Sequence, residues 1–167
     1  MNGMAGARRS ARPVRIALCT LLGGDIDGAW WPHTSSMAAE LPDLIAALHR
    51  PLGEIVEIGV NWSSTKGQPD LNSMHRGAMS LPGWRDKRQR LIAITGRRNC
   101  ARLLIVPSMT SAALGLMVLR RAAHLPIPAG QRETTVFKTA DYVVRAAQAE
   151  SASWVSGTPA GTLSTAP

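Results

Sequence analysis

The stretch that indicates the fold most directly is residues 89–106, which read QRLIAITGRRNCARLLIV. It contains two apolar runs, Gln89 to Thr95 and Ala101 to Val106, separated by the segment Gly96-Arg97-Arg98-Asn99. Apolar runs of this length on either side of a glycine-containing loop are typical of a β-hairpin. We therefore expect two adjacent antiparallel strands here.

Further strands are expected upstream of this hairpin. Val14 to Leu18 and residues 54–62 alternate between large apolar and polar or small side chains, and this period of two favours strands. At residues 54–62 the alternation also predicts a sheet with one face in water. Ala29-Trp30-Trp31 forms a short returning strand after Asp27-Gly28, and residues 74–81 hold one more short strand.

Two helices are expected, and a third is weakly indicated. Apolar residues from Met37 to Leu48 recur at helical spacing behind three hydroxyl residues that can cap the helix. Pro42 lies inside this helix and is expected to separate its first turn or to kink it. A second helix begins at Thr110 or Ser111, and residues 139–150 form a shorter third helix.

This order of elements favours an α+β fold. We expect a small, mostly antiparallel sheet of about five to six strands with two to three helices packed on one face. The chain has 167 residues, of which 45% are hydrophobic, which suits one domain and excludes a wholly disordered chain. We divide it into a flexible basic arm (1–12), a single α+β domain (13–128), a weak C-terminal helix (129–150) and a disordered tail (151–167).

The net charge of +8 is unevenly distributed. Residues 1–15 carry four arginines and no acid, residues 16–73 carry seven acids against two basic residues, and residues 74–102 carry eight basic residues against one acid. The last segment is interpreted either as a solvated face or as a surface for phosphate groups along one edge of the hairpin. Its candidate contacts are Arg85, Lys87, Arg88, Arg90, Arg97, Arg98 and Arg102.

Neither a secretion signal nor a membrane span is indicated. The apolar run from Ile16 to Leu22 follows a basic start, but it is short for a signal peptide and far below the roughly 20 residues that cross a bilayer. The two cysteines lack CxxC spacing and cannot form a disulfide-rich scaffold. We therefore expect a protein of the reducing cytoplasm.

The least ordinary segment is Asp27-Gly28-Ala29-Trp30-Trp31-Pro32, which holds two of the five tryptophans. Leu41-Pro42 follows it, and Gly83-Trp84 and Val106-Pro107 lie further along the chain. In these features the chain resembles, over roughly residues 14–123, a domain of unknown function found in uncharacterised actinobacterial proteins of the mycobacterial type. The resemblance implies a strand before the motif, a helix holding Glu-Leu-Pro after it, and no established activity.

The adjacent tryptophans suggest a contact surface. Neighbouring residues in a strand point to opposite faces, so we expect one of the two indoles in the core and the other exposed or over a cleft. Two interpretations stay open: both rings only seal the sheet and its helix, or the exposed ring is a platform for a ligand ring or a partner's side chain. The candidate binding residues are Asp25, Asp27, Trp30, Trp31 and His33.

Catalysis has only weak candidates. Asp27 and His33 are close enough in sequence to meet around a turn and exchange a proton, but Asp27-Gly28 is also a common turn dipeptide. The sequence has no nucleophile elbow, phosphate loop or HExxH motif, its four histidines lack metal-ligand spacing, and it implies no cofactor. Cys19 and Cys100 are interpreted as small residues on strands rather than reactive thiols.

We therefore expect a small, non-catalytic cytoplasmic binding or regulatory module. Its contact surfaces are the segment from Asp27 to Pro32 and the Arg-rich hairpin, and its partner is an unidentified protein or small ligand. The first alternative is binding of nucleic acid or another polyanion through the basic residues. The second alternative is a small enzyme with an Asp27/His33 site. No membrane interaction is expected.

Overall fold

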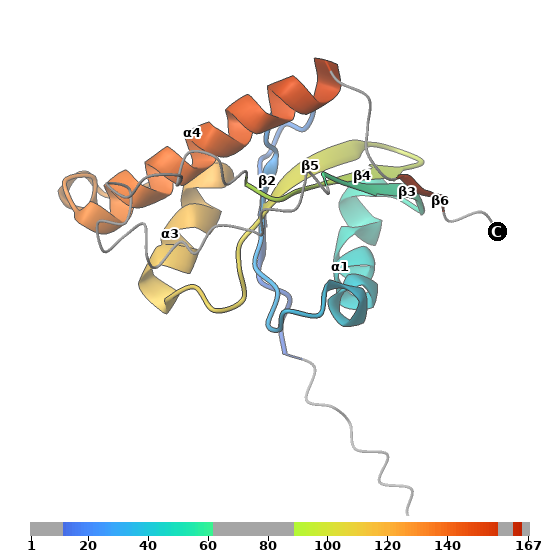
Figure 1. Ribbon diagram of the computed structural model, residues 1–167, viewed down its shortest axis with the longest axis horizontal. Coiled ribbons are helices and arrows are strands. Elements are labelled where there is room, and N and C mark those ends of the chain that lie inside the picture. Colours follow the sequence, from blue (N-terminus) through green and yellow to red (C-terminus); the bar gives the residue numbers. More distant parts are fainter. Residues whose placement is uncertain (1–11, 62–88, 157–161, 165–167) are drawn as a thin grey trace, which may run out of the picture.

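The computed structural model describes residues 12–61, 89–156 and 162–164, and within them it forms an α+β fold (Figure 1). Six strands make one mixed sheet in the order β1-β2-β5-β4-β3-β6. The strands are β1 (Ile16–Leu18), β2 (Gly28–Trp30), β3 (Ile55–Val60), β4 (Leu91–Gly96), β5 (Cys100–Ile105) and β6 (Thr162–Ser164). The helices are α1 (Met37–Leu52), α3 (Ala112–Ala122) and α4 (Thr135–Ser156), with a 3-10 turn, η3 (Ala129–Gln131). The predicted fold class is confirmed.

The β4–β5 hairpin forms the centre of the sheet, as its sequence predicts. The two strands pair antiparallel from Leu91 opposite Leu104 to Thr95 opposite Cys100. On its other edge β5 pairs with β2, and this contact is parallel, with Gly28 opposite Leu103. The remaining described pairs, β1 with β2 and β3 with β4 and β6, are antiparallel.

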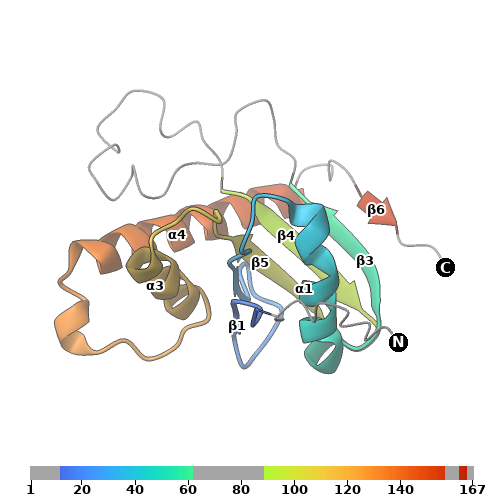
Figure 2. The same ribbon diagram turned by 90° about the horizontal axis from the view of Figure 1, so that it is seen from below.

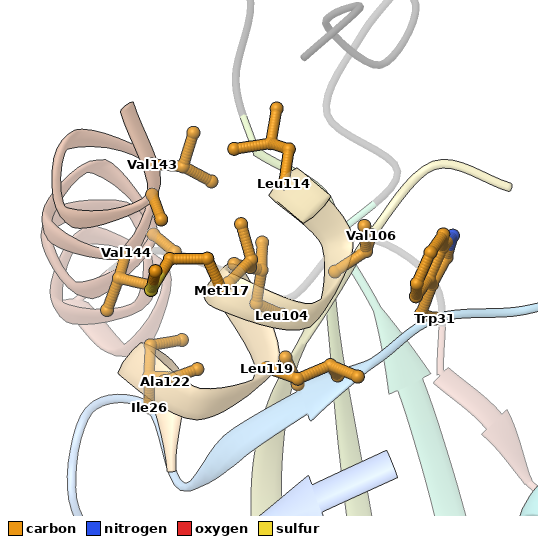
Figure 3. Packing of buried hydrophobic residues seen from close by; sticks show 14 of the residues in the cluster. Ile26, Trp31, Leu104, Val106, Leu114, Met117, Leu119, Ala122, Val143 and Val144 are labelled. Atoms are coloured by element: carbon orange, nitrogen blue, oxygen red, sulfur yellow. The ribbon is translucent and has the colours of Figure 1, made fainter. Parts of the chain in front are cut away.

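Helices cover both faces of the sheet, so the expected packing on one face is wrong. Leu103 and Ile105 face α1, whereas Leu104 faces α3 and α4, because successive strand residues point to opposite sides. Figure 2 shows α1 over one face and α4 behind the other, and Figure 3 shows Val143 and Val144 of α4 facing α3. A central strand buried on both faces reads as a continuous apolar run, which is why β5 shows little alternation.

Strand β3 departs from the predicted alternation. Ile58 and Val60 are buried against α1, but Val56 is 37% exposed and Ile55 packs against that core instead. The pairing register of β3 with β4 shifts between Ile55 and Glu57, and such a bulge turns the preceding side chains to the other face. The predicted solvent-exposed face is therefore present at the start of β3, at Val56 and Glu57, but not at the central strands β4 and β5, which are buried on both faces.

Helix α1 runs without interruption through Pro42, so the expected separate first turn is absent. Its buried face is formed by Leu44, Leu48 and Leu52, and this tertiary packing offsets the backbone hydrogen bond that Pro42 cannot donate. Pro42 itself is exposed.

Helix α4 is longer than the predicted residues 139–150. It buries small side chains at helical spacing, among them Ala140, Ala147 and Ser151, against α3 and the sheet. Residues 151–156 belong to this helix, and residues 162–164 pair with β3, so part of the expected disordered tail has regular structure. The basic arm up to residue 11 and the strand expected at residues 74–81 lie outside the described residues.

Candidate functional site

Asp27 is a buried structural carboxylate rather than an exposed ligand. It lies directly before β2 and is 2% exposed. Its Oδ1 accepts the backbone N–H groups of Gly23 and Gly24, both at 2.9 Å, and its Oδ2 accepts the N–H of Arg102 at 2.9 Å. These three donors hold the loop at residues 23–24 against β5, which positions the start of β2.

The glycine after Asp27 is required by the close approach of β1. Gly28 has a φ of +157°, and a Cβ at this position would lie 1.9 Å from the carbonyl oxygen of Ala17. A side chain would therefore force the two strands apart. The Asp-Gly pair of the motif thus has a structural explanation in both of its residues.

Both tryptophans of the motif are buried, so the expected exposure of one ring is wrong. Trp30 is 1% exposed and packs in the core beneath α1, while Trp31 is 4% exposed and packs beneath α3. Their opposite directions were predicted correctly, but each direction leads into a core because helices cover both faces. An aromatic platform at these rings is therefore excluded.

Arg15 fixes Trp31 from the side, a role that the sequence analysis missed. Its Nε donates to the carbonyl oxygen of Trp31 at 3.0 Å and its Nη2 to that of Pro32 at 2.7 Å. Its guanidinium carbon lies 3.7 Å from the centroid of the Trp31 ring, within the range of a cation–π contact. Burial lowers the pKa of Arg15 from its usual value, and nearby Glu40 acts in the opposite direction. The alternation from Val14 to Leu18 contained a signal, because it puts Arg15 on the same strand face as Ala17, and Ala17 packs against the core that holds Trp31.

Asp27 and His33 are not brought together. Asp27 bonds to the loop that precedes β2, whereas His33 follows the end of β2 and its Nε2 lies 2.9 Å from the carbonyl oxygen of Pro13. Along the β1–β2 ladder, Cys19 pairs with Asp27 at one end and Arg15 with Trp31 at the other. The weak catalytic pair of the sequence analysis is therefore separated by the length of the strand.

The described basic residues do not share one edge of the hairpin. Arg97 forms an exposed ion pair with Glu54 at 2.7 Å, and the Nη2 of Arg98 donates to the carbonyl oxygen of Arg50 at 2.7 Å, at the end of α1. Arg90 precedes β4, at the opposite end of the hairpin from the turn, and Arg102 lies within β5. Three candidates lie outside the described residues: Arg85, Lys87 and Arg88.

A cleft of about 520 Å³ gathers residues from both predicted sets. It lies at the amino-terminal ends of the parallel strands β2 and β5, beside the end of α4. Asp25 is exposed in it and makes no hydrogen bond or ion pair within the described residues. Arg102 is half-buried, and its Nη1 donates to the Oγ of Ser151 on α4 at 3.3 Å. The lining consists of Gly23, Gly24, Asp25, Asp27, Cys100, Arg102 and Ala152.

The two cysteines differ in exposure and electrostatics. Cys100 is exposed in this cleft, whereas Cys19 is half-buried and its thiol donates to the carbonyl oxygen of Ala122 at 3.5 Å. Burial raises the pKa of Cys19, and the negative charge of Asp27 raises it further. The thiolate of Cys19 is therefore scarce at neutral pH.

The described part of the chain was also compared with the features of a membrane-spanning helix and of a metal site. No helix there is long and apolar enough to cross a membrane. Within the same residues, no three His, Cys, Asp or Glu side chains are grouped as metal ligands.

Most of the chain, including β1 to β5, α1 and α3, matches a known sequence family. A model of a family of unknown function, DUF5994, matches residues 15–122, from the residue before β1 to the end of α3. The chain belongs to this family. No curated protein and no solved structure matches the chain. The DUF5994 region contains the motif, α1 and both parallel strands, while α4 follows it in sequence and supplies one wall of the cleft.

Proposed function

We propose that this DUF5994 protein is a small binding module whose ligand occupies the cleft of about 520 Å³ at the start of β2 and β5. The observation that carries the proposal is the placement of an unpaired carboxylate, Asp25, and a half-buried guanidinium, Arg102, in the same cleft. The volume falls within the range of small-ligand pockets, roughly 300–1,000 Å³.

The opposite charges select the ligand class. Arg102 is anchored on Ser151, so its planar fork is held by β5 and α4 and suits a carboxylate. Asp25 suits an ammonium group. Asp27 adds negative charge beneath them, but its oxygens are occupied by backbone donors, so it shapes the cleft and does not bind. A small zwitterion, a free amino acid in the simplest case, satisfies both charged groups.

The test is a titration of the full chain with free amino acids, followed through backbone amide resonances. We expect shifts at Gly23, Gly24 and Arg102, and we expect the N-acetyl and carboxamide derivatives, which each lack one charge, to bind less tightly. Arg102→Gln should weaken binding at least tenfold, as loss of a charge-assisted hydrogen bond does. Arg97→Gln removes the same charge outside the cleft and should leave binding unchanged. Absence of shifts at millimolar ligand, or equal effects of the two variants, would overturn the proposal.

Binding of nucleic acid or another polyanion is the second candidate. The observation in its favour is that Arg97 and Arg98 are exposed together at the hairpin turn. Their existing contacts with Glu54 and with the end of α1 oppose it, because phosphate would have to compete for them. If about six phosphates are contacted, affinity for duplex DNA should fall by about three orders of magnitude between low and moderate salt. A flat salt response rejects this function.

A further inference from the structure

The sheet has one covered edge and one open edge. At one end β6 pairs with β3, whereas at the other end β1 pairs with β2 alone (Figure 2). No other strand among the described residues lies beside β1. An open strand edge presents backbone donors and acceptors that pair readily with another strand. The outer edge of β1 is therefore a candidate contact surface.

The backbone groups on this open edge belong to Ile16 and Leu18. In an antiparallel ladder, every second residue bonds to the neighbouring strand. Arg15 and Cys19 do so here: the carbonyl oxygen of Arg15 accepts the N–H of Trp31 at 2.8 Å, and the N–H of Cys19 donates to the carbonyl oxygen just before β2 at 2.7 Å. The N–H and C=O groups of Ile16 and Leu18 consequently point away from β2, and they make no bond among the described residues.

Nothing within β1 protects this edge. Charged residues, prolines and bulges commonly keep edge strands from pairing. β1 contains none of these, since it consists of two large aliphatic residues with an alanine between them and pairs with β2 without a register shift. The nearest charge belongs to Arg15, whose guanidinium is held over the ring of Trp31 by two carbonyl oxygens that follow β2. Arg15 therefore serves the core and does not guard the edge.

Apolar side chains accompany the free backbone groups. Ile16 and Leu18 are half-buried on the face that α1 covers. Leu21 follows β1 by three residues, and its side chain is 86% exposed. A strand placed along β1 would shield these side chains from water, which adds hydrophobic stabilisation to the backbone bonds.

The pattern of free groups fits a second copy of the same edge. Two β1 strands that run antiparallel, with Ala17 opposite Ala17, put Ile16 of each copy opposite Leu18 of the other. Because both residues have free outward groups, this register forms four backbone hydrogen bonds, two at each of these pairs. A register shifted by two residues pairs only one of the two positions within β1. The edge is therefore complementary to itself.

The charges at the two ends of β1 favour the same arrangement. Arg12 is exposed before the strand, and Asp25 is exposed in the loop that follows it. Antiparallel pairing brings the basic end of one strand toward the acidic end of the other, whereas parallel pairing would place like charges side by side. This complementarity selects a second copy related by a two-fold axis.

From these observations we infer that two copies of the chain pair through β1 and form a two-fold dimer with one continuous sheet. The opposite edge of each sheet is covered by β6, so the assembly closes at two copies and does not grow into a fibre. The paired strands are short, so the dimer is weak and forms as the concentration rises. It does not depend on the cleft that we propose for a zwitterion.

Sedimentation equilibrium of the full chain tests the inference from micromolar to millimolar concentration. The average mass should rise toward twice that of the monomer, and amide exchange at Ile16 and Leu18 should slow over the same range. In the proposed register the two Ala17 Cα atoms lie about 4.5 Å apart, so a mixture of labelled and unlabelled chains should show a contact between their α-protons. A chain that stays monomeric at millimolar concentration, or a dimer without this contact, would overturn the inference.

Three variants separate the edge from other surfaces. Ile16→Pro removes an outward N–H, and hence two of the four bonds, so the dissociation constant should rise at least tenfold. Its urea midpoint should stay near that of the wild type, because the lost N–H points away from β2. Leu21→Lys leaves the fold untouched and puts a second cation toward the basic end of the partner strand, so it should also weaken the dimer about tenfold.

Leu116→Lys is the matched control for Leu21→Lys, since it makes the same change at a 52% exposed position on α3. Its dissociation constant should stay within about twofold of the wild type. Equal effects of the two lysine variants, or a larger effect of Leu116→Lys, would place the contact elsewhere and refute pairing through β1.

Discussion

Replacing Asp27 by asparagine tests whether this motif residue holds the fold. The carboxylate is 2% exposed and accepts three backbone N–H groups. Asparagine has a single oxygen, so it can serve either the two glycine N–H groups or the N–H of Arg102. In the better orientation it keeps the glycine pair, turns its NH₂ toward the Arg102 N–H, and creates a donor–donor contact.

The magnitude follows from these three bonds. Hydrogen bonds to a charged acceptor contribute about 1.5–3 kcal/mol each and neutral ones about 0.5–1.5 kcal/mol. Losing one bond and weakening two, offset by the smaller cost of burying a neutral group, gives a loss of about 2–4 kcal/mol in the free energy of unfolding. Equilibrium urea denaturation measures this loss, and hydrogen exchange should be faster at Gly23, Gly24 and Arg102.

Asp25→Asn is the matched control, since the same change two residues earlier affects an exposed carboxylate that has no bond within the described residues. Its free energy of unfolding should stay within about 0.5 kcal/mol of the wild type. If Asp27→Asn also lowered the free energy of unfolding by less than about 0.5 kcal/mol, the structural role of Asp27 would be refuted, because the buried carboxylate would then contribute nothing to stability.

Three other variants and measurements test the packing and the electrostatics. Gly115→Ala should lower the free energy of unfolding by about 1–3 kcal/mol in urea denaturation, because the added Cβ would lie 2.6 Å from the buried ring of Trp31. Leu116→Ala, at a 52% exposed position, should lower it only slightly, and equal losses in the two variants would contradict this packing. Iodoacetamide should label the exposed Cys100 well before Cys19, because burial raises the pKa of Cys19; mass spectrometry follows the labelling, and equal rates at the two thiols would contradict this expectation. Since the Cys19 thiol ionises at lower pH in the unfolded chain than in the folded one, its contribution to the free energy of unfolding is lost as pH rises. Arg98→Ala should lower the free energy of unfolding by about 1 kcal/mol, since it removes the hydrogen bond that Nη2 donates to the carbonyl oxygen of Arg50 at the end of α1. Arg97→Ala removes an exposed ion pair and should lower it by less than about 0.5 kcal/mol; the reverse order in urea denaturation would be inconsistent with the structure.

Most elements of the fold were predictable because their signals are local. The hairpin at residues 89–106 is encoded by two apolar runs and a glycine turn, and α1 by apolar residues at helical spacing. Helix α4 was underestimated because alanines form much of its buried face, and alanines give a weak periodic signal. The bulge in β3 depends on its pairing with β4, so the alternation within residues 54–62 could not place Val56.

The candidate sites depended on contacts between distant segments. The sequence alone determined that Trp30 and Trp31 point in opposite directions, because alternation is a property of any strand. Only the tertiary structure decided that both rings are buried, since α1 and α3 cover opposite faces of the sheet. In the same way, the parallel pairing of β2 with β5 brings residues from two segments to one cleft, and a pairing between segments 75 residues apart leaves no local mark on either of them.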